Sequence, residues 1–327
     1  MQINTVTRIV TLEEIRQAAD RIRNIARRTP LADVSGAAGR PLYLKCENLQ
    51  PAGAFKIRGA YNMVAQLTAD QRAHGVITYS SGNHGQAMAL AARELGAHAV
   101  VVMPTTAPKN KIEGAKGFGA EVILAGTTSA DRRQRAEAEA SARGLTMVPP
   151  FDHEWIIAGQ GTCGLEILEQ CPDVAGVLVP IGGGGLVAGI SAAIKQSKPD
   201  VKVIGVEPTG AAAMKASVDA GHLVTLPTTE TVADGLMPVR PGDMAFAHVT
   251  RFVDAVVTVT DSAIVDAVFW IFANARVVAE PSGAATTAAV LCGALDAAMR
   301  IDGPIVAVVS GGNMAPERLA ELLVMWQ

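Results

Sequence analysis

Short runs of apolar, β-branched residues alternate along the chain with longer stretches in which apolar residues recur every three or four positions. The first pattern predicts buried strands and the second predicts amphipathic helices. The predicted strands are Pro41–Cys46, Val76–Tyr79, Ala99–Met103, Glu121–Leu124, Gly176–Val179, Val201–Val206 and Ile305–Val309. The predicted helices include Leu12–Ala26, Gly85–Leu95, Lys109–Phe118, Asp131–Arg143, Ile156–Glu169 and Leu186–Gln196. This alternation predicts an α/β fold, with parallel sheets that carry helices on both faces.

The domain organisation follows from the same pattern. The chain has 327 residues, which favours about two domains, although no low-complexity linker divides it. The strand–helix units of residues 75–150 form a compact run, and we expect them to be a smaller, inserted domain. Residues 1–70 and 151–327 would then build a larger domain.

Composition narrows the class of protein. The sequence is 49% hydrophobic and 18% charged, so it can bury a large core. The 28 basic and 31 acidic residues leave a formal charge of −3, which gives no basic surface for nucleic acid or an anionic membrane. The amino-terminal segment has acidic residues where a signal peptide needs an apolar core, so we expect a cytoplasmic protein. The four cysteines lack the spacing of a zinc or disulfide motif.

Two segments in the amino-terminal half carry candidate chemistry. Lys56 lies in the apolar, glycine-flanked segment from Gly53 to Ala60, at a predicted junction of loop and helix. Burial lowers the pKa of an ammonium group, so Lys56 is a candidate for Schiff-base chemistry; the alternative is a surface lysine on a first helical turn. The segment from Ser80 to His84 follows a predicted strand and opens a helix, which suits a carboxylate ligand. The alternative is an ordinary helix cap, with His84 as a packed or capping side chain.

A glycine run in the carboxyl-terminal half also follows a predicted strand. The four glycines from Gly182 to Gly185 would let several N–H groups converge on one phosphate. Gly183, Gly185 and Ala188 also fit a dinucleotide-binding pattern, with Glu207 about twenty residues further on. An NAD-binding oxidoreductase therefore remains open as a function of a different class.

Two further turns are candidates because of their position after or before a regular element. Ser310 opens a Ser-Gly-Gly-Asn turn at the carboxyl end of a predicted strand, where ligands bind in open parallel sheets. Glu280 precedes a proline at a predicted helix start, where it could place a buried carboxylate nearby. Either residue could equally be an ordinary turn residue.

Taken together and in this order, these segments resemble the fold-type II pyridoxal-phosphate enzymes, in particular the serine/threonine dehydratase and serine racemase group. The resemblance runs from Arg28–Leu31 to the turn at Ser310, with further matches at Ala158–Thr162 and Ala233–Gly235. It implies a pyridoxal 5′-phosphate cofactor and a tryptophan-synthase-β-like fold of two open, mostly parallel, twisted sheets flanked by helices. It also implies that the larger domain, residues 1–70 and 151–327, binds this cofactor and that the smaller domain, residues 75–150, grips the substrate. The implied substrate is a small amino acid, and the implied assembly is a homo-oligomer, expected as a dimer.

The resemblance assigns roles to individual residues. Lys56 would hold the cofactor as a Schiff base and take the Cα proton of the substrate, with Phe55 packed beside the cofactor ring. Asn83 would hydrogen-bond the ring hydroxyl group, and Ser310 the pyridine nitrogen. The cofactor phosphate would lie on the loop formed by Gly182, Gly183, Gly184, Gly185 and Leu186. The substrate carboxylate would lie on the loop formed by Ser80, Ser81, Gly82, Asn83 and His84, with Ser81 as the acid–base group opposite Lys56.

The implied activity is that of a dehydratase, which eliminates water from a β-hydroxy amino acid to give a 2-oxo acid and ammonia. An amino-acid racemase of the serine type is the alternative. Tyr79 and Ala130 stand where racemase-like relatives carry histidine and arginine, and Ala213 removes a carboxylate from a cation site that would include Glu207, so no metal is expected. Ala54 replaces a serine of the family pattern, which favours threonine or a bulkier aryl-serine as substrate.

Overall fold

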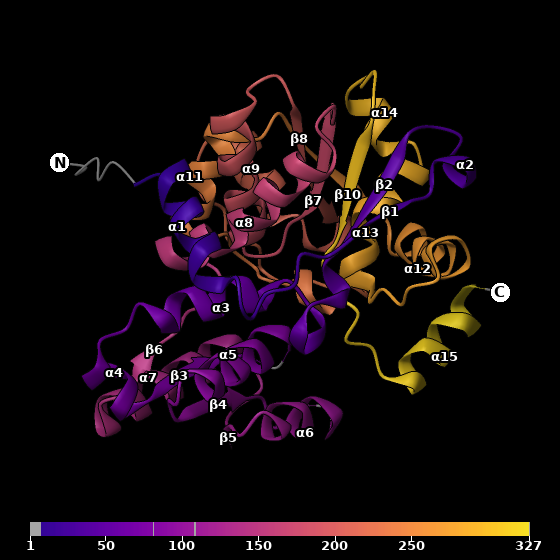
Figure 1. Ribbon diagram of the computed structural model, residues 1–327. Helices are drawn as coiled ribbons and strands as arrows, with labels where there is room; N and C mark the ends of the chain where they lie inside the picture. Colours follow the sequence, from indigo (N-terminus) through magenta and orange to yellow (C-terminus); the bar gives the residue numbers. More distant parts are fainter. Residues whose placement is uncertain (1–7, 81, 108, 327) are drawn as a thin grey trace.

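The computed structural model describes residues 8–80, 82–107 and 109–326, and it contains two sheets (Figure 1). The larger sheet has six strands in the order β1-β2-β10-β7-β8-β9. Strand β1 pairs antiparallel with β2, and the other neighbours pair in parallel. The strands of this sheet are β1 (Leu31–Asp33), β2 (Leu42–Cys46), β7 (Gly176–Pro180), β8 (Lys202–Pro208), β9 (Ala255–Val259) and β10 (Ile305–Val309).

The smaller sheet has four parallel strands in the order β5-β4-β3-β6, and it lies in the lower part of Figure 1. Its strands are β3 (Val76–Tyr79), β4 (Ala99–Met103), β5 (Glu121–Leu124) and β6 (Thr146–Met147). Two mostly parallel sheets flanked by helices confirm the predicted fold class. The division into domains at residues 70, 75 and 150 stays a prediction.

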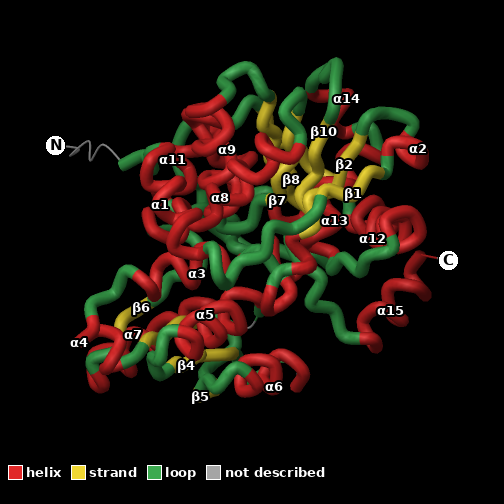
Figure 2. Tube along the Cα trace, in the orientation of Figure 1, coloured by secondary structure: helices red, strands yellow, loops and turns green. Residues whose placement is uncertain are grey.

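Helices cover both faces of the larger sheet, as Figure 2 shows. Four helices each contribute two or more buried residues to a core on one face: α1 (Leu12–Ile22), α8 (Glu154–Gln170), α9 (Gly185–Ser197) and α11 (Asp243–Phe252). Three helices share a separate core with the other face: α12 (Asp261–Ala275), α13 (Pro281–Leu291) and α14 (Ala294–Ala298). The apolar runs of β7 and β10 are buried throughout, because helices lie on both sides of them.

A third core joins the smaller sheet to the rest of the protein. It combines α3 (Lys56–Ala65) and α5 (Asn83–Glu94) with the first turn of α8. The predicted helix Leu12–Ala26 is shorter than expected, because α1 ends at Ile22 and the chain turns there. The remaining helices are α2 (Ser35–Ala38), α4 (Ala69–His74), α6 (Lys109–Gly117), α7 (Ser129–Arg143), α10 (Ala213–Ala220) and α15 (Pro316–Trp326). No helix within the described ranges is both long enough and apolar enough to cross a membrane.

Candidate active site

The loop before Lys56 is joined to the turn after β10, although about 250 residues of sequence separate them. The Phe55 N–H donates a hydrogen bond of 3.0 Å to the Ser310 carbonyl. Gly53 has a φ of +70°, and a Cβ there would lie 2.0 Å from Asn313 Oδ1, so only glycine fits this position. The structure therefore brings the first and last of the predicted site segments together.

The Lys56 amine lies at the first residue of α3, where its nitrogen faces a backbone carbonyl. Its Nζ donates to the Pro150 carbonyl at 2.7 Å and lies 5.1 Å from the centre of the Phe55 ring. Burial lowers the pKa of this amine from 10.5 to about 8, because the charged form is poorly solvated there. Near neutral pH a substantial fraction of the amine is thus unprotonated and able to act as a nucleophile or a base.

The segment that follows β3 presents its polar groups near this amine. The Gly82 N–H donates to Ser80 Oγ at 3.3 Å. Burial, together with the positive charge of Lys56, lowers the pKa of His84 to about 3, so its ring is neutral and its Nε2 donates to the Val148 carbonyl at 3.1 Å. His84 therefore supplies no positive charge for a carboxylate. Ser81 lies outside the described residues, and its role stays a prediction, as does that of the whole loop.

Asn83 belongs to a chain of side chains that ends on a buried carboxyl group. Asn313 Nδ2 donates to Asn83 Oδ1 at 2.9 Å, and Asn83 Nδ2 donates to Glu280 Oε1 at 2.6 Å. Burial, reinforced by the negative charge of Asp234, raises the pKa of Glu280 to about 8. These contacts fix the orientation of the Asn83 amide while leaving it one N–H and one lone pair. The sequence pattern marked Glu280 as a helix start with a buried carboxylate, but it did not indicate the link to Asn83, which spans 197 positions.

The glycine loop leads into the first turn of α9. No hydrogen bond within the described ranges engages the N–H groups of residues 182–186. A Cβ on Gly183 would lie 2.3 Å from the Phe151 ring, and a Cβ on Gly185 would lie 2.8 Å from the Phe151 carbonyl. Gly184 has a φ of +97°. The loop therefore requires glycines, and its free N–H groups at the amino end of a 13-residue helix fit a phosphate group.

Ser310 is buried directly after the carboxyl end of β10. Its Oγ donates to the Ser282 carbonyl at 3.4 Å. The next residue, Gly311, has no space for a side chain, since a Cβ there would lie 2.2 Å from Glu280 Oε1. This packing leaves a hydroxyl group as the polar side chain at the strand end, consistent with the predicted partner of a pyridine nitrogen.

A cavity of about 810 Å³ opens beside these groups. Glu280, Asn313, Lys111 of α6 and Asp234 are among the residues that line it. Lys111 and Asp234 form an ion pair between the parts of the chain that carry the smaller and the larger sheet.

Glu207, which the family resemblance places in a cation site, has hydrogen-bond partners within the protein. Glu207 accepts hydrogen bonds from the Met214 N–H at 2.8 Å and from the Lys215 N–H at 2.7 Å. Its carboxylate therefore caps the amino end of α10. Burial raises the pKa of Glu207 to about 7. The side chain is occupied within the protein rather than directed at a nucleotide ribose, as the oxidoreductase alternative would require.

Comparisons with known proteins agree with this chemistry. Residues 22–311 match the family model described as pyridoxal-phosphate dependent enzyme. The chain belongs to this family. Its cofactor is accordingly pyridoxal phosphate, which confirms the predicted resemblance and removes the NAD-binding alternative. The free N–H groups of the glycine loop and the low-pKa amine of Lys56 both suit this cofactor.

Individual relatives and structures show how far the similarity extends. The L-threonine ammonia-lyase of Thermotoga maritima is 44% identical over 310 residues, which cover 94% of this chain and 76% of that protein. The catabolic L-threonine dehydratase of Staphylococcus aureus is 40% identical over 332 residues, which cover 99% of this chain and 96% of that protein. The structure of maize serine racemase has a TM-score of 0.92 at 37% identity and covers 97% of this chain and 98% of that one.

Proposed function

We propose that this protein is a pyridoxal-phosphate-dependent ammonia-lyase that eliminates water from threonine or serine to give a 2-oxo acid and ammonia. The observation that carries the proposal is the Lys56 amine, which is held at the Pro150 carbonyl with a pKa of about 8. An amine of this kind can both bind a cofactor aldehyde and remove a proton near neutral pH. The relatives with 44% and 40% identity are an L-threonine ammonia-lyase and an L-threonine dehydratase, which supports the choice of lyase and substrate.

Different residues of the chain bind the cofactor and move the substrate proton. The bound cofactor supplies an electron sink for the charge that develops at the substrate Cα. Lys56 Nζ takes the proton from that carbon, and the N–H groups of the glycine loop donate hydrogen bonds to the phosphate. Asn83 holds the ring hydroxyl group in the orientation set by Glu280. Ser310 offers the ring nitrogen a hydroxyl group, which enforces protonation less than a carboxylate and so favours elimination.

The structure changes the expected substrate. Ala54 is 1% exposed and forms an isolated β-bridge with Gly311. Its side chain therefore lines no open pocket, and the argument that this alanine makes room for an aryl-serine loses its basis. We propose threonine and serine as the substrates to test first.

A racemase is the second candidate, and the similarity to maize serine racemase is the observation that favours it. The proposed acid–base group on the opposite face, Ser81, is common to both readings. Tyr79 and Ala130 stand in place of the histidine and arginine that the resemblance associates with racemases. We therefore place elimination first.

One assay separates the two candidates. Purified protein with bound cofactor is given L-threonine and L-serine, and 2-oxo acid release and formation of the D-enantiomer are measured together. We expect 2-oxo acid release to exceed racemisation, Lys56→Ala to abolish both, and Lys116→Ala, at an exposed lysine, to change neither. Racemisation without 2-oxo acid would contradict the proposal.

We further propose that the protein acts in the cytoplasm as a dimer. Light scattering of the protein with bound cofactor tests the second point: a mass equal to one chain would contradict it. Cell fractionation tests the first.

A further inference from the structure

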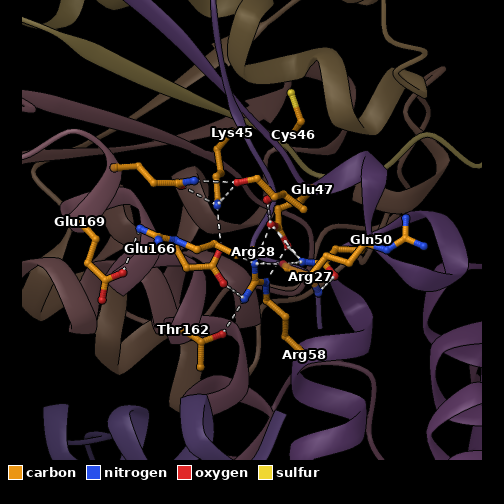
Figure 3. Close-up of polar contacts among 12 residues, drawn as sticks. Arg27, Arg28, Lys45, Cys46, Glu47, Gln50, Arg58, Thr162, Glu166 and Glu169 are labelled. Atoms are coloured by element: carbon orange, nitrogen blue, oxygen red, sulfur yellow. Dashed lines mark hydrogen bonds and ion pairs between the residues drawn. The ribbon is translucent and has the colours of Figure 1, made fainter. Parts of the chain in front are cut away.

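A closed cluster of buried charges lies directly beside the start of α3 (Figure 3). The Arg58 guanidinium donates two hydrogen bonds to Glu47, from Nε to Oε2 at 2.7 Å and from Nη2 to Oε1 at 2.8 Å. It donates two more to Glu166, from Nη1 to Oε1 at 2.7 Å and from Nη2 to Oε2 at 2.8 Å. Nη1 also reaches Thr162 Oγ1 at 3.0 Å. Both Arg58 and Glu47 are completely buried. We call Arg58, Glu47, Glu166 and Thr162 the arginine clamp.

A second cation balances the charge of this clamp. Lys45 Nζ donates to Glu166 Oε2 at 2.6 Å and to the Thr29 carbonyl at 2.7 Å. Two cations therefore face two carboxylates, and the net charge of the cluster is zero. Buried ion pairs add little stability compared with apolar side chains of the same volume, because desolvation offsets the attraction. Their two-pronged hydrogen bonds do fix the relative orientation of the groups they join.

The clamp joins three parts of the fold at the point where Lys56 begins α3. Glu47 lies in the short 3₁₀ helix after β2, and Glu166 and Thr162 lie in α8. Arg58 is two residues after Lys56, so the two side chains leave α3 roughly 200° apart and point in nearly opposite directions. A rotation of α3 by ~10° would move the side-chain atoms at its rim by roughly 1 Å. The clamp therefore controls the position of the Lys56 side of the helix.

Close backbone contact also links α3 to α8. A Cβ on Gly159 would lie 2.6 Å from the Arg58 carbonyl and 2.6 Å from Gly59 Cα, so the two backbones touch. The Gly59 N–H donates a hydrogen bond of 3.2 Å to Gln160 Oε1, and Asn62 Nδ2 donates one of 2.7 Å to the Trp155 carbonyl. The clamp adds three hydrogen bonds from Arg58 to Thr162 and Glu166 of α8, and it ties this pair of helices to Glu47 through two-pronged contacts.

We propose that Arg58, held by Glu47 and Glu166, is a positioning residue that sets the place of Lys56 Nζ in the active site. The proposal rests on the proposed role of Lys56 as the cofactor-bearing lysine. Arg58 acts through the rotation of α3 and touches none of the reacting atoms. A nitrogen displaced by about 1 Å is expected to cost roughly 100-fold in rate while binding changes little.

Arg58→Lys tests the proposal in the protein with bound cofactor. The variant keeps the charge but cannot form two forked contacts at once. We expect kcat to fall roughly 100-fold and KM to change by less than about threefold. We also expect the pH midpoint of the absorption band of the Lys56-bound cofactor to shift by about one unit, because burial and neighbouring dipoles set the proton affinity of that nitrogen. Thr162→Val removes one acceptor with little change in shape and should show the same effects to a smaller degree.

Lys195→Met is the matched control. Lys195 forms a partly buried ion pair of 2.8 Å with Asp254 at the carboxyl end of α9, away from α3. We expect it to lower the melting temperature while the pH midpoint and kcat stay unchanged. The proposal is overturned if Arg58→Lys and Thr162→Val leave the midpoint unshifted, whatever their stability. Wild-type protein that shows the absorption band of the Lys56-bound cofactor but releases no 2-oxo acid contradicts the proposed function. The pH midpoint of that band still tests the role of Arg58 in this case.

Discussion

The low pKa of the Lys56 amine makes a quantitative prediction for cofactor-free protein. Burial brings this pKa from 10.5 to about 8. At pH 7.5 about one quarter of the amine would then be unprotonated, compared with about one in a thousand for an ordinary lysine. We therefore expect the rate at which trace acetic anhydride labels Lys56 to rise with a midpoint near pH 8. Mass spectrometry of the peptide that contains Lys56 measures this rate across a pH series.

The same peptide supplies the control. In protein unfolded by urea the amine is hydrated, so the labelling midpoint should return to the ordinary lysine range. Limited access to the folded site lowers the rate at every pH but leaves the midpoint in place, so burial and protonation are measured separately. A midpoint above pH 10 in the folded protein would refute the argument that desolvation activates this amine.

Stability gives an independent measure of the same shift. Between pH 8 and 10.5 the unfolded chain binds a proton at Lys56 that the folded protein has lost, so folding becomes more favourable as the pH rises. A difference of 2.5 pH units corresponds to roughly 3 kcal/mol. Lys56→Met should remove this increment from the pH dependence of urea unfolding. Identical pH dependence in both proteins would contradict the lowered pKa.

Three further perturbations test other parts of the site. Gly183→Ala should weaken cofactor binding, because its Cβ would lie 2.3 Å from the Phe151 ring, whereas Gly36→Ala, with no atom within 4 Å, should leave the dissociation constant unchanged. Between pH 4.5 and 8 the folded Glu280 carboxyl keeps a proton that the unfolded one loses, so this group makes the wild-type protein less stable as the pH rises. Glu280→Gln should remove this contribution from the pH dependence of unfolding. An equal slope in both proteins would count against the raised pKa. A chelator should leave activity intact, because Glu207 already caps a helix; complete inactivation that only metal reverses would show otherwise.

The sequence predicts best the short strands rich in β-branched residues. The bounds of β3, β4, β5 and β10 agree with the prediction residue for residue. The runs of β4 and β10 are apolar throughout, which fits strands buried on both faces. The start of α13 was predicted at Glu280 but its extent was not, because small residues fill this helix and every one of its first ten positions is buried, which leaves no amphipathic period. The start of α3 was likewise predicted near Lys56 but its extent was not. Arg58 and Asn62 are polar and yet buried, so the pattern of polar positions does not mark the solvent face of this helix.

Some features of the site can likewise be predicted from the sequence, and others cannot. The glycine loop can be predicted because four consecutive glycines and a following helix are local features. The contact of Lys56 with the Pro150 carbonyl depends on how residues 94 positions apart pack together. Glu280 likewise acquires its pKa of about 8 from burial in the folded protein. Such values depend on the tertiary environment, which no local pattern in the sequence contains.

The contact between the Phe55 loop and the turn after β10 has a consequence for the order of events during synthesis on the ribosome. The strand β10 inserts between β2 and β7, and its last residue is followed by the Ser310 carbonyl that accepts the Phe55 N–H. At a synthesis rate of ~5–20 residues per second, the carbonyl is made roughly 12 to 50 s after Lys56. Throughout that interval β2 lacks its parallel neighbour β10, and the Phe55 N–H lacks its partner at Ser310. A cofactor site that includes Ser310 is therefore complete only after β10 has been synthesised.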